Sequence, residues 1–174
     1  METATAKTYN LAHAFIGELT HESQTTRKVL ERIPPETFDY KPHEKSMTMS
    51  RLAVHVAEMT SWVTVTCNQS ELDFAKFDYK PLEPKTSAEL VEYLDKSVGD
   101  AIEALKNTSD EAMLEPWTLK NGDQVYFTMP KIQTLRSMCL NHIIHHRGQL
   151  SVYLRLNDIP VPSLYGPSAD EGQM

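Results

Sequence analysis

The amino-acid sequence predicts an all-α fold, a four-helix bundle with long crossover connections. Four segments repeat their apolar residues with the period of an α-helix, and few segments have the alternation of a strand. Amphipathic helices bury their apolar faces by packing against one another, which favours a bundle. The connections between the four segments are longer than the short loops of up-and-down bundles, so we expect crossovers.

The first two helices are expected over residues 9–32 and 49–68. The first stops at Pro34-Pro35, because proline lacks the backbone N–H of a helix interior and clashes with the preceding turn. Thr48 is the expected N-cap of the second helix, since its hydroxyl can accept a hydrogen bond from a free backbone N–H of the first turn.

The third helix is expected to begin at Thr86–Glu89, which fits a capping box, and to continue to Leu105. The fourth covers residues 130–156 and begins at a proline, which the first turn of a helix tolerates. Between them, residues 117–120 and 124–127 flank Asn-Gly and predict a small β-hairpin before the last helix. Residues 159–174 are rich in proline and glycine and indicate an extended tail, within a single domain spanning 1–174.

Composition indicates an ordinary globular protein and disfavours nucleic acid as its partner. Of the 174 residues, 40% are hydrophobic and 24% charged, and 24 acidic against 17 basic side chains give a net charge of −7. This charge disfavours nucleic-acid binding. No apolar run reaches the roughly 20 residues needed to span a bilayer, and the start of the chain lacks a secretion signal. Two cysteines do not make a disulfide framework, so we expect a cytoplasmic protein.

Three of the seven histidines predict a metal site. His142 and His146 lie one helical turn apart on the apolar side of the fourth helix, a spacing at which two imidazoles can bind one ion. His55 shares the apolar stripe of the second helix. Facing helices of bundles are where such sites are built, and three protein ligands are typical of catalytic zinc. The alternative is that these are hydrogen-bonded core histidines without a metal.

Neighbouring residues leave further alternatives at the site. His145 could replace His146 as the partner of His142, although we favour His146. Cys139 lies one turn before His142, but a free cysteine is more often a core residue than a ligand. Glu58, three residues after His55, could orient its imidazole, but we favour a solvated position for this side chain.

The sequence around these histidines resembles the DinB/YfiT-like metalloenzymes. Residues 142–150 match the HHRGQL signature of that family, and residues 40–55, Trp62 and residues 165–168 also fit. The resemblance implies a bundle with crossover topology and a divalent ion, zinc or nickel, held by His55, His142 and His146. Members are often homodimers, and some transfer low-molecular-weight thiols such as bacillithiol or mycothiol to electrophiles, so the resemblance also implies a homodimer and such a thiol as a partner.

Our leading hypothesis is a metal-dependent transferase or hydrolase in which a thiol or water attacks a small-molecule electrophile. The sequence names no catalytic residue, although His145, Gln149 or Tyr153 could orient the substrate. Arg147 is expected in a salt bridge, and Gly148 is expected to allow another backbone to approach closely. The competing hypothesis is a non-catalytic protein, in which the ion ties two helices together or reports metal availability.

Overall fold

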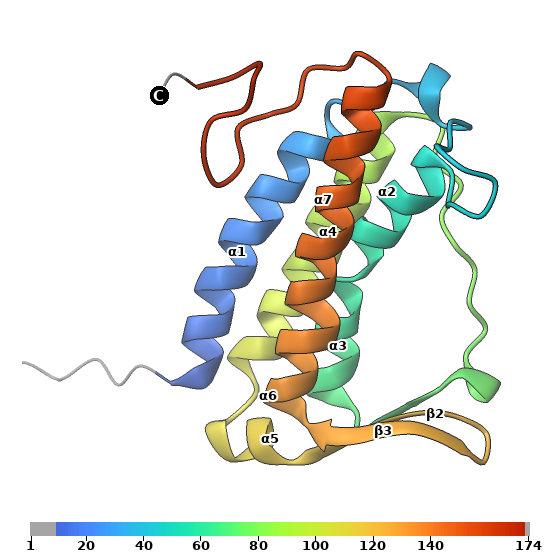
Figure 1. Ribbon diagram of the computed structural model, residues 1–174. Coiled ribbons are helices and arrows are strands. Elements are labelled where there is room, and N and C mark those ends of the chain that lie inside the picture. The colour runs from blue at the N-terminus through green and yellow to red at the C-terminus, as the bar shows by residue number, and fades with distance from the viewer. Residues whose placement is uncertain (1–9, 173–174) are drawn as a thin grey trace, which may run out of the picture.

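The computed structural model describes residues 10–172, and in this range the chain is mainly helical with one small three-stranded sheet (Figure 1). The predicted mainly helical fold with a hairpin is therefore confirmed. The helices are α1 (Leu11–Leu30), α2 (Met49–Glu58), α3 (Ser61–Asn68), α4 (Ser87–Lys106), α5 (Asp110–Leu114), α6 (Lys131–Thr134) and α7 (Asn141–Leu156), and the strands are β1 (Glu71–Asp73), β2 (Pro116–Asn121) and β3 (Gln124–Pro130).

Helix α1 follows the prediction closely. The Asn10 side chain caps it by accepting a hydrogen bond from the backbone N–H of His13, and the helix ends before the two prolines. Tyr9, where we expected the helix to begin, lies outside the described residues. α1 packs against α4 and α7 along its length (Figure 1).

The second predicted helix is two helices, so the expectation of one continuous helix over 49–68 was wrong. Thr48 caps α2 as predicted, but the helix ends at Glu58 and α3 starts at Ser61. The hydroxyls of Thr60 and Ser61 donate to the carbonyls of Ala57 and Glu58, at 3.0 and 2.7 Å. These local bonds give the backbone an alternative to continuing the α-helical pattern.

Helix α4 begins at the predicted cap. The backbone N–H of Glu89 donates to the Thr86 hydroxyl at 3.2 Å. The Glu89 carboxylate accepts from the backbone N–H of Lys85 at 2.8 Å, one residue earlier than a capping box requires.

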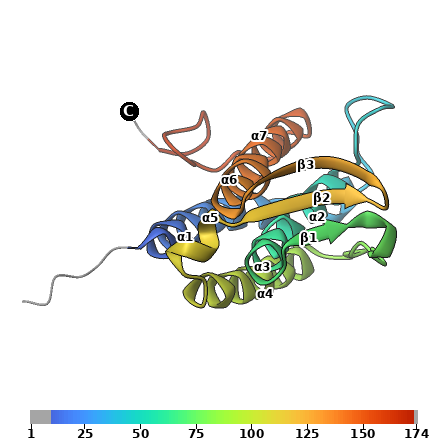
Figure 2. The same ribbon diagram turned by 90° about the horizontal axis from the view of Figure 1, so that it is seen from below.

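The predicted hairpin is the β2–β3 pair, and it belongs to a larger sheet. Gly122 in its turn has a φ of +58°, a conformation that glycine adopts without steric cost. β1 pairs with β2 in parallel, giving the order β1-β2-β3 at the lower end of the helices (Figure 2). The sequence did not predict β1, which has only three residues, or the short helix α5.

The last predicted helix is interrupted before the histidines. α6 is followed by a π-helical segment over Leu135–Leu140, and α7 then carries the histidine motif. A π-helical turn contains more residues than an α-helical turn, so it changes which of the following side chains face the core. Such segments often lie at functional sites. Leu135 and Cys139 of this segment are fully buried against α3 and α4 residues.

Arg147 and Gly148 in α7 test two further expectations. Arg147 is 1% exposed and pairs with Glu22 of α1 at 2.7 Å, so the predicted salt bridge is confirmed. The expectation for Gly148 was wrong, because no atom outside its own helix lies within 4 Å of the position that a Cβ would take. Among the described residues, no helix has the length and apolar character of a membrane span.

Candidate metal centre

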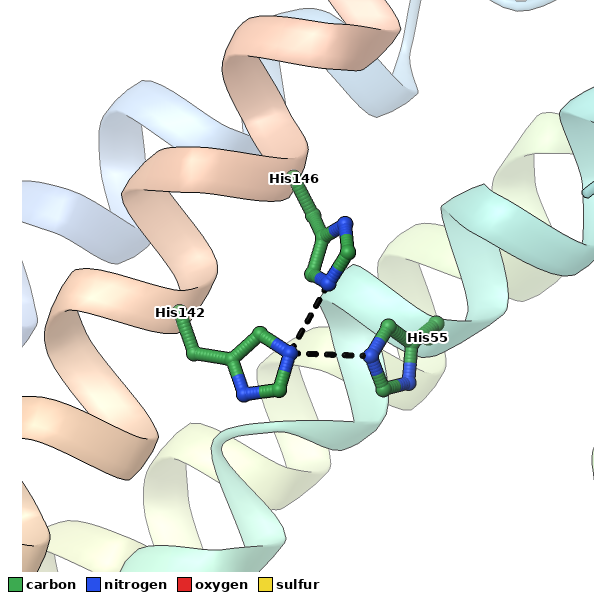
Figure 3. A group of neighbouring side chains, drawn as sticks. All are labelled: His55, His142 and His146. Carbon is green, nitrogen blue, oxygen red and sulfur yellow. Dashed lines mark hydrogen bonds between the residues drawn. The ribbon is translucent and has the colours of Figure 1, made fainter. Parts of the chain in front are cut away.

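Three imidazole rings from two helices meet between α2 and α7. His55 points from α2 towards His142 and His146, which lie one turn apart on α7 (Figure 3). The Nε2 atom of His142 lies 3.3 Å from that of His55 and 2.8 Å from that of His146. The ligand atoms of all three rings lie within 4.8 Å of one another. The structure therefore brings together the three histidines that the sequence singled out.

Two of the three rings have a partner outside the cluster on the opposite nitrogen. Nδ1 of His55 lies 3.0 Å from a carboxylate oxygen of Glu58, and Nδ1 of His146 lies 2.7 Å from the amide oxygen of Gln149. Because carboxylate and amide oxygens only accept, these two Nδ1 atoms carry a proton and donate it outwards.

Because His55 and His146 donate through Nδ1, their Nε2 atoms carry lone pairs, and both of these lie close to Nε2 of His142. Two imidazole nitrogens at 2.0–2.1 Å from one tetrahedral zinc ion lie about 3.3 Å apart. The Nε2 atom of His142 lies 3.3 Å from that of His55 and 2.8 Å from that of His146, so the first pair has this spacing and the second is slightly closer. The donor set thus fits a divalent cation, with the outer hydrogen bonds that metal-bound histidines usually make.

The surroundings keep two of these rings neutral. Burial lowers the pKa of His142 to about 4, and the neighbouring His146 and His55 act in the same direction. Burial also lowers the pKa of His146. Both rings therefore offer unprotonated nitrogens at neutral pH, which is the form that binds a metal ion.

Glu58 is buried beside His55, so the expectation that it would be solvated was wrong. Its carboxylate accepts from the Tyr79 hydroxyl at 2.5 Å and lies 3.3 Å from Nη1 of Arg51. Burial alone would raise the pKa of Glu58, but the hydrogen bonds from His55 and Tyr79, together with Arg51, hold it below its usual value. The spacing of three residues on one helix signalled the contact with His55. The sequence offered no signal for Tyr79, which comes from the segment between β1 and α4.

The other candidate ligands lie outside the cluster. His145 is exposed, with its ring centroid 4.8 Å from that of His146. Cys139 is fully buried in the helical core, and burial raises the pKa of its thiol well above the ordinary range. Tyr153 is also a core residue, whose hydroxyl donates to the carbonyl of Met47 at 3.3 Å. Gln149, which we expected to orient substrate, instead accepts a hydrogen bond from the ring of His146.

Comparison with known proteins identifies the family. The model of the DinB family matches residues 4–173, nearly the whole chain. The chain belongs to the DinB family. Among curated proteins, this DinB protein is similar to the uncharacterized protein YrdA of Bacillus subtilis (strain 168), with 25% identity over 161 residues, covering 90% of this chain and 89% of YrdA.

Two solved structures share the fold of this DinB protein. One is a DinB-like protein from Bacillus cereus ATCC 10987, with a TM-score of 0.66 and 23% identity, covering 87% of this chain and 95% of that one. The other is the DinB-like protein YjoA from Bacillus subtilis, also with a TM-score of 0.66, at 18% identity and covering 83% of this chain and 92% of that one. At these identities the likeness extends to the fold.

Proposed function

We propose that this DinB protein binds one divalent metal ion through the Nε2 atoms of His55, His142 and His146. The observation that carries the proposal is the convergence of the three imidazoles: their ligand atoms lie within 4.8 Å of one another, and His55 and His146 donate their Nδ1 protons outwards. The competing interpretation is three hydrogen-bonded histidines without a metal.

The ion that we propose is zinc or nickel. Neutral imidazole suits both, so the donor set by itself selects neither. Three protein ligands are the number found at catalytic zinc sites, whereas structural zinc sites use four. Cys139 does not supply a fourth ligand in this arrangement, because the three-histidine cluster found among the described residues does not include it.

We further propose that the protein is a metal-dependent transferase or hydrolase, of the kind that transfers a thiol to a small-molecule electrophile. When bound, a divalent ion lowers the pKa of a thiol or a water molecule and so supplies a nucleophile at neutral pH. The chain's own contribution is to hold the rings: Glu58 fixes His55 and Gln149 fixes His146, each through Nδ1. The buried Cys139, with its raised pKa, is a poor nucleophile.

Metal content measured by mass spectrometry tests the ligand set. We expect about one ion per chain in the purified protein, none in His142→Ala, and an unchanged content in His145→Ala. The two variants make the same substitution within one turn of α7, but only His142 belongs to the cluster. Equal metal content in the two variants, or loss in His145→Ala alone, would contradict the assignment.

Thiol consumption in the presence of an electrophile tests the activity. We expect turnover by the metal-loaded protein, loss of turnover after chelation and recovery when the ion is restored. A protein that binds one ion per chain and shows no metal-dependent turnover, with water or thiol as nucleophile, would establish the non-catalytic alternative.

The oligomeric state is a separate proposal. We propose a homodimer on the basis of the family resemblance, to be tested by light scattering. Leu140 is 1% exposed and packs in the core of its own chain, so this residue does not belong to the dimer surface.

We also propose that the architecture is a four-helix bundle. Its four members would be α1, α4, α7 and the consecutive pair α2–α3. Contacts of α1 with α4 and α7, and of the α2–α3 pair with both, support this description. A crystal structure would test it directly.

A further inference from the structure

A cavity of about 510 Å³ lies against His55, on the side of α2 and α3 that faces the segment between β1 and α4. Figure 1 shows this segment running beside α2 and α3 towards the start of α4. Small-molecule sites in proteins have volumes of roughly 300–1,000 Å³. The cavity is therefore large enough for a ligand of a few fused or linked rings.

Five of the twelve residues that line the cavity are Trp, Phe or Tyr. Its aromatic side chains come from α3, α4 and the segment between β1 and α4, and they are Trp62, Phe74, Phe77, Tyr79 and Tyr93. Phe77 and Tyr79 are stacked with ring centroids 6.2 Å apart and are 47% and 45% exposed. The ring centroids of Trp62 and Phe74 lie 6.1 Å apart. Large apolar side chains gathered and exposed in this way mark a binding surface.

Each charge in the wall already has an opposite partner. Nη1 of Arg51 lies 3.3 Å from the Glu58 carboxylate, and the Lys80 ammonium lies 3.0 Å from Asp78. The four charged side chains of the lining therefore sum to zero. The lining therefore offers no net charge to attract a charged ligand, whereas a neutral ring would gain aromatic contacts.

The cavity and the three-histidine cluster share a wall. His55 lines the cavity, and its Nε2 belongs to the cluster. Tyr79, also in the wall, donates to Glu58, which in turn accepts from His55. A molecule in the cavity would therefore lie next to the ring of His55, which also belongs to the three-histidine cluster.

We propose that this cavity binds an uncharged aromatic small molecule and that it is the position of the electrophilic substrate. The assignment as a substrate position rests on the proposed function, whereas the binding itself does not. An aromatic electrophile in the cavity would contact His55, whose Nε2 belongs to the cluster.

Isothermal titration calorimetry at pH 7 with three probes of one shape tests the ligand class. The probes are 1-naphthol, which is neutral, 1-naphthoate, which is anionic, and 1-naphthylmethylammonium, which is cationic. We expect naphthol to bind at least tenfold more tightly than either charged probe. Equal or tighter binding of a charged probe would overturn the assignment to an uncharged ligand.

Three truncations on the surface locate the binding site. Phe77→Ala and Phe74→Ala each remove part of the cavity wall, and we expect naphthol affinity to fall about tenfold. Leu156→Ala truncates a large apolar side chain of similar exposure, 55%, that does not line the cavity, and we expect a change of less than twofold. Circular dichroism verifies that each variant is folded. Equal losses in Phe77→Ala and Leu156→Ala would show non-specific adsorption and overturn the proposal.

The metal-site variant separates this inference from the proposed function. His142 does not line the cavity, so we expect naphthol to bind His142→Ala as it binds the wild-type protein. Naphthol binding in a protein without stoichiometric metal would refute the proposed function and leave the cavity assignment standing. Stoichiometric metal binding without naphthol binding would refute the cavity assignment and leave the proposed metal site standing.

Discussion

Replacing Glu58 by glutamine should weaken metal binding without removing any proposed ligand. The Glu58 side chain is 8% exposed and lies 3.0 Å from Nδ1 of His55. Glutamine has nearly the same shape and keeps an acceptor oxygen, so the substitution removes mainly the negative charge behind the ring. A negative charge hydrogen-bonded behind a ligating imidazole strengthens the bond of that ring to a cation.

The size of the effect follows from how much of the charge is available to His55. Loss of such outer partners typically reduces metal affinity 10–100-fold. Here Arg51 lies 3.3 Å from the same carboxylate oxygen and the Tyr79 hydroxyl donates to the other one, so part of the charge is already compensated. We therefore expect a loss near the lower end, about tenfold, which corresponds to about 1.4 kcal/mol.

A competition titration against a chromophoric chelator measures this change in affinity. The matched control is Glu103→Gln, which changes the net charge equally at a side chain on α4 that is 65% exposed. We expect the control to bind the ion with wild-type affinity. Equal affinities of Glu58→Gln and Glu103→Gln would refute the reasoning, because the buried hydrogen bond would then contribute nothing.

Three further predictions concern stability and are measured by urea unfolding of the metal-free protein. Arg147→Met leaves the buried Glu22 carboxylate without its ion-pair partner and should lower the free energy of unfolding by about 3–5 kcal/mol. Arg27→Met, at an exposed ion pair, should change the free energy of unfolding far less; similar values for both would contradict the burial of Arg147. Gly148→Ala should raise the free energy of unfolding by about 0.5–1 kcal/mol, because no neighbouring atom opposes the added methyl group; a destabilised variant would reveal a close contact. Because the fold lowers the pKa of His142 to about 4 from an ordinary value of 6.5, the unfolded chain binds the proton first, so stability should fall as the pH falls from 6.5 to 4. His142→Gln should flatten that part of the profile, and an unchanged profile would show that His142 does not cause the loss.

The sequence was most informative where the signal is local. His142 and His146 belong to one helix, and a spacing of four residues places two side chains on one face whatever the rest of the fold does. The apolar stripe around His55 similarly fixed the direction in which its ring points. The hairpin was predictable for the same reason, since Asn-Gly and its flanking residues decide the turn without distant partners.

The features that the sequence missed depend on contacts between distant segments. β1 has three residues and is a strand because it pairs with β2, more than forty residues later. Tyr79 reaches Glu58 only because the segment before α4 runs beside α2. The break between α2 and α3 had a local signal in Thr60 and Ser61, but hydroxyls of this kind also occur within helices, and tertiary packing decides between the two outcomes.

Contacts within the protein hold the three histidines of the candidate site in place. Within one turn of α7, His146 faces α2 while the adjacent Arg147 is buried against Glu22 of α1, so both sides of the turn are held by the protein. The rings are further fixed through Nδ1 by groups that a metal would not touch. Such a preorganised site loses little conformational freedom when an ion binds. Metal affinity should therefore respond mainly to substitution of Glu58. The stability of the fold should respond mainly to substitution of Arg147.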